Sequence, residues 1–308
     1  MPGLTAAGGR RLAAALLLLA SAAVRAHAPD EAPMAANNWP MHWSFEPWVL
    51  VLLAASLLAY GLGLRRLWQR AGWGRGILPL QATAFGAGWL ALVAALLSPL
   101  DALGAALFSA HMLQHEVLMV VAAPLLVLGR PLAAWAWVAP RSGRHWLGRA
   151  LHRRWWVRAW QLITDPLVAW ALHGIVLWGW HLPAAFEAAL ASSAWHALQH
   201  ASFLFSALLF WWATLGPSAR HRPGAAGFYL FTTMLHTGAL GALLTLAPTL
   251  WYHRYGDAAS ALGVDPLQDQ ALGGLVMWVP AGLAYPAAAL MLLAQILMPT
   301  RGLRRASG

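Results

Sequence analysis

Two pairs of histidines occur in this sequence with the same spacing. His111 and His115 stand in the stretch His-Met-Leu-Gln-His, and His196 and His200 stand in His-Ala-Leu-Gln-His. Residues four apart lie on one face of a helix, so each pair could offer two imidazoles to one metal ion or one haem edge. Each pair lies near the start of a long apolar run. Because polar groups are costly in hydrocarbon, histidines placed there indicate a functional site.

The composition is that of a membrane protein. The chain has 308 residues, of which 60% are hydrophobic and only 10% charged, as expected for a polytopic membrane protein. Cysteine is absent, which excludes disulfides and thiolate metal sites and leaves histidine and methionine to hold any soft metal. The net charge of +10 is carried by arginines. They cluster in short loops without a basic, aromatic-rich face, so we expect no nucleic-acid partner.

The N-terminal segment resembles a targeting signal. Arg10 and Arg11 precede an apolar stretch, and Ala26-His27-Ala28 is typical of a cleavage site. We therefore predict a signal peptide over residues 1–28, the alternative being an uncleaved first anchor. Residues 29–46 are polar and are expected to form an extracytoplasmic arm.

An all-α bundle of about seven membrane spans is predicted over residues 47–300, since each apolar run is close to the roughly 20 residues that a bilayer requires. The expected spans are Pro47–Leu64, Leu78–Ser98, Ala105–Leu128, Pro166–Pro183, Ala194–Leu215, Ala226–Leu250 and Ala271–Met298. Residues 130–165 are rich in arginine and tryptophan, which favours an amphipathic segment along the membrane surface. Residues 301–308 form a basic tail.

The distribution of arginines predicts the orientation. Arginines follow the first, third, fifth and seventh spans, whereas Arg254 is the only one on the other side beyond residue 28. Positively charged loops stay in the cytoplasm. We therefore expect the mature N-terminus outside, the C-terminus inside, and a multi-pass protein of the bacterial cell membrane.

This topology places histidines from three spans at similar depth. His111, His196 and His200 lie in the outer halves of the third and fifth spans, and His181 lies at the outer end of the fourth. His115 lies deeper, near the middle of the membrane. We expect these five to form a ligand set. Further candidates are thioethers, one more histidine and two acids, one of which could orient His115 through a hydrogen bond: His236, Met112, Met277, Asp269 and Glu116.

Histidine and methionine without cysteine suit copper best, with zinc second and haem iron third. A haem would need two histidines facing each other, which His115 could provide with His200 or His236. No hydrolase motif, phosphate loop or nucleotide fingerprint occurs, so we do not expect an enzyme.

Several further motifs together resemble the Caa3/CtaG family, the polytopic, cysteine-free assembly factors of caa3-type cytochrome c oxidase. The resemblance covers roughly residues 45 to 300. Besides the two histidine pairs it includes Ala123-Pro124-Leu125, Gly129-Arg130-Pro131, Trp180-His181-Leu182-Pro183, Phe210-Trp211-Trp212, Asp269-Gln270, Gly273-Gly274 and Met277-Trp278-Val279-Pro280. The family resemblance implies a role in maturing cytochrome c oxidase, with oxidase subunits as partners and copper supplied from the outer face.

The leading hypothesis is therefore a membrane assembly factor that holds or delivers copper, with a soluble extracytoplasmic copper carrier as a further candidate partner. One alternative is a copper permease, which would need ligands leading to the cytoplasm; none are visible below His173 and His236. The other is a haem-binding membrane electron-transfer protein.

Overall fold

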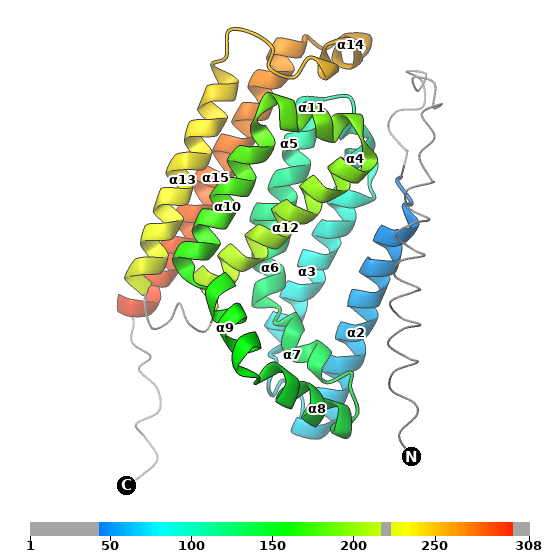
Figure 1. The fold of residues 1–308 in the computed structure, drawn as a ribbon, viewed down its shortest axis with the longest axis vertical. Coiled ribbons are helices and arrows are strands. Elements are labelled where there is room, and N and C mark those ends of the chain that lie inside the picture. The colour runs from blue at the N-terminus through cyan, green and yellow to red at the C-terminus, as the bar shows by residue number, and fades with distance from the viewer. Residues whose placement is uncertain (1–42, 217–222, 298–308) are drawn as a thin grey trace.

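The computed structural model describes residues 43–216 and 223–297, and helices form all the regular secondary structure in these ranges (Figure 1). The expected signal at 1–28, most of the arm at 29–46 and the tail at 301–308 lie outside the described residues. Six helical stretches are long and apolar enough to cross a membrane. They are α2 (Pro47–Ala71), α3 (Pro79–Leu96), the stretch Phe108–Leu128, α12 (Ser193–Leu215), α13 (Pro223–Thr245) and α15 (Pro266–Leu297). The predicted polytopic all-α bundle is confirmed.

The fourth predicted span, Pro166–Pro183, corresponds to α10 (Pro166–His181), which has 16 residues. α9 (Arg154–Ile163), within the segment predicted to follow the membrane surface, precedes it at an angle of 58°. Pro166 causes the break, because proline has no N–H for a continuing helix but suits the first helical position. Asp165 then caps α10 by accepting from the backbone N–H of Leu167 at 3.0 Å.

The third span begins at Phe108 rather than at Ala105, and it is not one regular helix. A short helix, α4 (Pro99–Gly104), comes first, and the span itself is divided into α5 (Phe108–Glu116), the π-helix η2 (Val117–Ala122) and α6 (Ala123–Leu128). In η2 the N–H of Ala123 bonds to the carbonyl of Leu118. The next carbonyl, of Met119, would pair with Pro124, which has no N–H. The indole N–H of Trp211 on α12 donates to it instead, at 2.8 Å.

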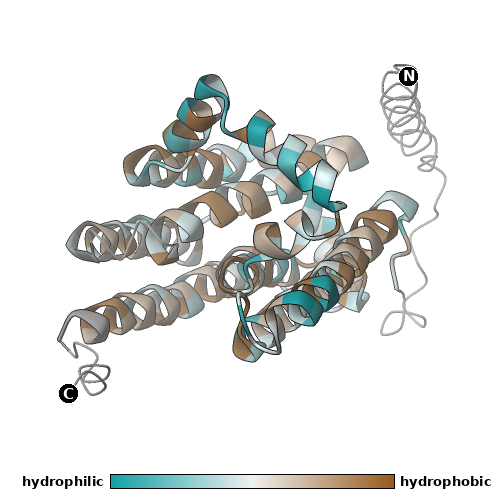
Figure 2. Ribbon diagram, turned by 90° about the horizontal axis from the view of Figure 1, so that it is seen from below, coloured by the Kyte–Doolittle hydropathy of each residue, from teal (hydrophilic) through white to brown (hydrophobic). Residues whose placement is uncertain are grey.

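Charged residues separate to the two ends of the bundle. We call the end formed by α4, α11 (Pro183–Ala191) and α14 (Arg254–Ala261) the carboxylate-rich end, because it carries Asp101, Glu187 and Asp257. The opposite, arginine-rich end is formed by α7 (Pro131–Ala136), α8 (Arg141–Leu151), α9 and the last turns of α2 (Figure 1). Viewed from this end, the bundle helices are mostly hydrophobic, with hydrophilic stretches confined to a few segments (Figure 2).

The helices that carry the paired histidines are the central ones. In the apolar windows of Phe108–Leu128 and α12, 61% and 56% of the residues are buried, compared with 22% for α2 and for α3. α2 and α3 therefore expose most of their apolar side chains, as helices in contact with lipid do. The fold turns the histidines of the two motifs toward the protein interior, whereas Leu113 and Leu198 within the same motifs are exposed.

Candidate metal centre

Five histidines from three helices converge near the carboxylate-rich end. The ring centroids of His111 and His115 on α5 are 4.3 Å apart, and those of His196 and His200 on α12 are 4.2 Å apart. The two pairs face each other, with 5.3 Å between His111 and His196 and 5.2 Å between His115 and His200. His181, the last residue of α10, lies 6.3 Å from His115. The structure thus brings together all five histidines of the predicted ligand set.

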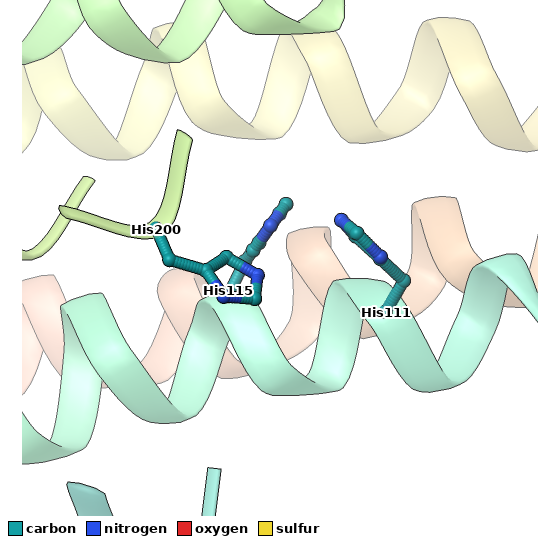
Figure 3. Close-up of side chains that lie close together, drawn as sticks. All are labelled: His111, His115 and His200. Carbon is teal, nitrogen blue, oxygen red and sulfur yellow. The ribbon is translucent and has the colours of Figure 1, made fainter. Parts of the chain in front are cut away.

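Three of these histidines form the most compact group. One ring nitrogen each from His111, His115 and His200 lies within 4.8 Å of the others, and all three side chains are buried. Figure 3 shows His111 and His115 rising from the same helix, with the His200 ring beside that of His115. Metal-bound imidazole nitrogens lie about 2.0–2.1 Å from a zinc ion. A contraction of about an ångström, reached by side-chain rotation, would let the three bind one ion of this size.

The ring nitrogens of the five histidines are suited to bind a metal. The Nε2 atoms of His111, His115, His181, His196 and His200 are all buried without a hydrogen-bond partner among the described residues. In His181, Nδ1 lies 2.7 Å from the carbonyl oxygen of Leu177. A carbonyl only accepts, so Nδ1 carries the proton and Nε2 of the neutral ring keeps its lone pair. Buried polar atoms without partners are costly, and metal coordination would compensate them.

Asp269 has a different role from the auxiliary ligand that the sequence suggested. This buried residue of α15 accepts from the backbone N–H groups of Phe108 at 2.6 Å and Ser109 at 3.3 Å, and from the Ser109 hydroxyl. It thereby satisfies the free N–H groups at the start of α5, where a negative charge is also favoured by the helix dipole. Asp269 therefore holds the helix that carries His111 and His115.

Gln114 and Gln199, the glutamines within the two histidine motifs, were not recognised as candidates from the sequence. Gln114 is buried and donates to the Ala95 carbonyl at 2.7 Å and to Asp101 at 2.8 Å. Gln199 is also fully buried and lies beside His111, yet its amide nitrogen and oxygen have no hydrogen-bond partner among the described residues. Their position could have identified them, because each glutamine directly precedes the second histidine of its motif.

The other candidate residues lie outside the histidine cluster. Met112 and Met277 are buried in the hydrophobic core. His236 on α13 lies against Trp170, so the structure does not form the His115–His236 pair considered for haem. No hydrogen bond joins His115 to Glu116, because neither ring nitrogen of His115 has a partner among the described residues. Glu116 lies instead near Tyr285.

A cavity of about 650 Å³ connects the cluster with the carboxylate-rich end. His111 and His196 line its inner side, and Glu46, Asp101 and Arg254 are among the other lining residues. Ser44 donates to Asp101 at 2.5 Å, and Arg254 pairs with Glu187 at 3.5 Å. The cluster is thus buried but borders a polar cavity, which would admit a hydrated cation.

Tyr255 of α14 also lines this cavity. Burial, with a further contribution from the Asp269 carboxylate, raises the pKa of the Tyr255 hydroxyl well above its usual range. The hydroxyl therefore stays protonated and donates to the Gly104 carbonyl at 2.9 Å. Gly104 in turn packs closely against His111: a Cβ at residue 104 would lie 3.3 Å from the His111 Cα.

The fold and the site define a polytopic helical membrane protein with a buried histidine cluster near one end. The chain belongs to the family described as cytochrome c oxidase caa3 assembly factor (Caa3_CtaG), which matches residues 58–298. This confirms the resemblance noted from the sequence motifs.

Curated relatives occur in mycobacteria. The chain is 28% identical over 249 residues to the uncharacterized protein Mb0105 of Mycobacterium bovis and to the uncharacterized protein MT0111 of Mycobacterium tuberculosis. The match covers 77% of this chain but only 36% of each relative, so the chain spans about a third of their length. No solved structure gives a significant match.

Proposed function

We propose that this protein holds copper in its five-histidine cluster and presents it at the carboxylate-rich end during assembly of cytochrome c oxidase. The observation that carries the proposal is the convergence of five buried Nε2 atoms for which the described residues provide no hydrogen-bond partner. The link to cytochrome c oxidase comes from the family to which the chain belongs. The recipient would be an oxidase subunit and the donor a soluble carrier, both on the side onto which the cavity opens.

Copper is favoured over other divalent metals by the donor set. Imidazole binds zinc, copper, nickel and iron, and at a given nitrogen site divalent copper binds most tightly of the first-row series. His111, His115 and His200 would form the compact site. His196, which lines the cavity and contacts both His111 and His200, would receive the ion first. Each of these histidines would bind through Nε2, which is buried and has no hydrogen-bond partner among the described residues.

The structure favours holding and release over transport through the membrane. Beyond His115 and Glu116 the third span buries Leu118, Met119 and Ala122. Of these three side chains only the Met119 thioether could bind copper, and a single ligand does not make a path to the arginine-rich end. A permease would need such a path, so we assign the protein a non-enzymatic binding and delivery role.

Metal titration of the purified full-length protein tests the proposal. We expect at least one copper ion bound per chain, and loss of that ion in the triple variant H111A/H115A/H200A. The matched control is H253A, because His253 lies at the same end but is exposed. Equal binding by the triple variant and the control would contradict the proposal. A Soret band in the purified protein would instead favour the haem alternative.

A further inference from the structure

A second cavity, of about 470 Å³, lies at the arginine-rich end, far along the bundle from the histidines. It is formed by the last turns of α2 and by the segment that connects α7 with α8. Among the residues that the structure describes, no carboxylate lines this cavity. Its lining consists of Gln69, the segment 138–140 and four arginines: Arg66, Arg70, Arg141 and Arg144. The volume is within the range of small-ligand sites, roughly 300–1,000 Å³.

Two of the arginines are held in place by the cavity wall. Arg66 donates to the carbonyl of Val138, and the Arg144 guanidinium lies 4.2 Å above the ring of Trp137. Arg70 and Arg141 have no hydrogen bond or ion pair with the described residues. Four positive charges around one cavity repel each other, and a bound anion would offset that repulsion. Guanidinium groups are suited to phosphate because they bind two of its oxygens at once.

The start of α8 adds further donors at the same place. Pro140 and Arg141, the N-cap and first residue of this 11-residue helix, both line the cavity. The first intrahelical bond runs from the N–H of Arg144 to the Pro140 carbonyl. The N–H groups of the preceding residues therefore have no helical acceptor, and the helix dipole is positive here. Both properties favour an anion.

The surroundings indicate that the anion belongs to a lipid. Trp73 and Trp146, on the segments flanking the cavity, are 75% and 65% exposed, and Trp155 on α9 is 57% exposed. Exposed tryptophans concentrate where a membrane protein meets the lipid headgroups. We propose that this cavity binds the phosphate group of an anionic membrane lipid. A soluble phosphate ester shares this chemistry, but the tryptophans place the cavity at headgroup level, where basic pockets recognise anionic lipids.

The test uses the full-length protein in lipid nanodiscs made of phosphatidylcholine, with or without a lipid that carries two phosphates. Lipid retained after detergent exchange is counted by native mass spectrometry. We expect selective retention of the diphosphate lipid, and a weakening of about fivefold for each arginine removed, hence about 25-fold for R70Q/R141Q. R149Q/R158Q is the matched control, since these arginines also lie at this end but do not line the cavity. R70K/R141K keeps the charge and should retain part of the binding.

The variants and the phosphate competition distinguish a lipid site from two alternatives. Equal losses in R70Q/R141Q and R149Q/R158Q would show general surface attraction and overturn the proposal. Displacement of the lipid by millimolar inorganic phosphate would overturn it in favour of a soluble phosphate ligand. A circular dichroism spectrum compares the folding of each variant with that of the parent. If R70Q/R141Q unfolds, retention by the single variants R70Q and R141Q decides the question.

Discussion

Gln199 is the residue whose surroundings most need an explanation. It follows His196 by three residues and precedes His200 by one, and it is fully buried beside His111. Its amide has no hydrogen-bond partner in the described part of the chain. A buried amide loses its hydrogen bonds to water at a substantial cost. We infer that Gln199 positions the His111 ring, or a water on the metal, when the site is loaded.

The variant Q199M keeps the length and apolar volume of the side chain but removes both polar atoms. Loss of a group that orients metal ligands costs about 10- to 100-fold in metal affinity, so we expect copper binding to weaken by at least about tenfold at unchanged stoichiometry. Competitive titration against a chelator measures this. Q268M, at an exposed position of α15, should bind as the parent does, and an unchanged affinity in Q199M would refute the positioning role.

For individual residues, the sequence predicts which side chains belong to the site better than it predicts which residues they contact. The four-residue spacing of His111 and His115 is enough to place both on one helical face. The partner of Asp269 is different, since its contact with Phe108 and Ser109 spans about 160 positions. Nothing local at Asp269 distinguishes a helix cap from a metal ligand, so only the packing of α15 on α5 reveals its role.

The helix α5 is held at both ends by neighbouring elements. Asp269 of α15 caps its start, and below it Trp211 of α12 fills the hydrogen-bonding gap that Pro124 leaves in η2. Because the histidine pair lies between these two attachments, the direction of its imidazoles depends on them. π-helical turns often occur at functional sites, and here one lies directly after Glu116.

Removing the cap tests this dependence. We expect D269A to lose about 0.5–2 kcal/mol of stability, the usual cost of losing a helix cap. Copper affinity should fall as well, although Asp269 does not belong to the histidine cluster. Thermal unfolding in detergent followed by metal titration measures both. D257A is the control, because Asp257 is an exposed acid on α14. If D269A is destabilised but binds copper with unchanged affinity, the cap does not determine the geometry of the histidine cluster.

Apolar length predicted the spans well, but it could not predict their breaks. The predicted fourth span begins at Pro166, as α10 does, and Pro124 indicates a kink in the third span, but neither proline tells how the chain bends. Proline is present at both places, yet membrane helices tolerate proline when neighbours supply the missing hydrogen bonds. Whether a kink, a π-turn or a 58° bend results depends on the packing partners.

The whole molecule is electrically polarised, and this polarity should determine its orientation. The arginine-rich end carries α7 to α9 and is expected in the cytoplasm, which leaves the histidine cavity facing outward. A reporter that is active only outside the cytoplasm should be silent when fused after Gly308. The same reporter inserted after Gly263, in the loop following α14, should be active. The reverse pattern would place the histidine cavity on the cytoplasmic side.

An outward-facing site can deliver only to acceptors that face the same way. Cells lacking this protein should therefore assemble the oxidase polypeptides and their haem, yet lose activity because copper is missing. Added copper should rescue activity in part, because mass action can replace a carrier when free metal approaches the dissociation constant of the acceptor. Measuring copper and haem in oxidase purified from a deletion strain decides the question. Normal copper together with absent haem would contradict copper delivery and point to a haem-related role in assembly.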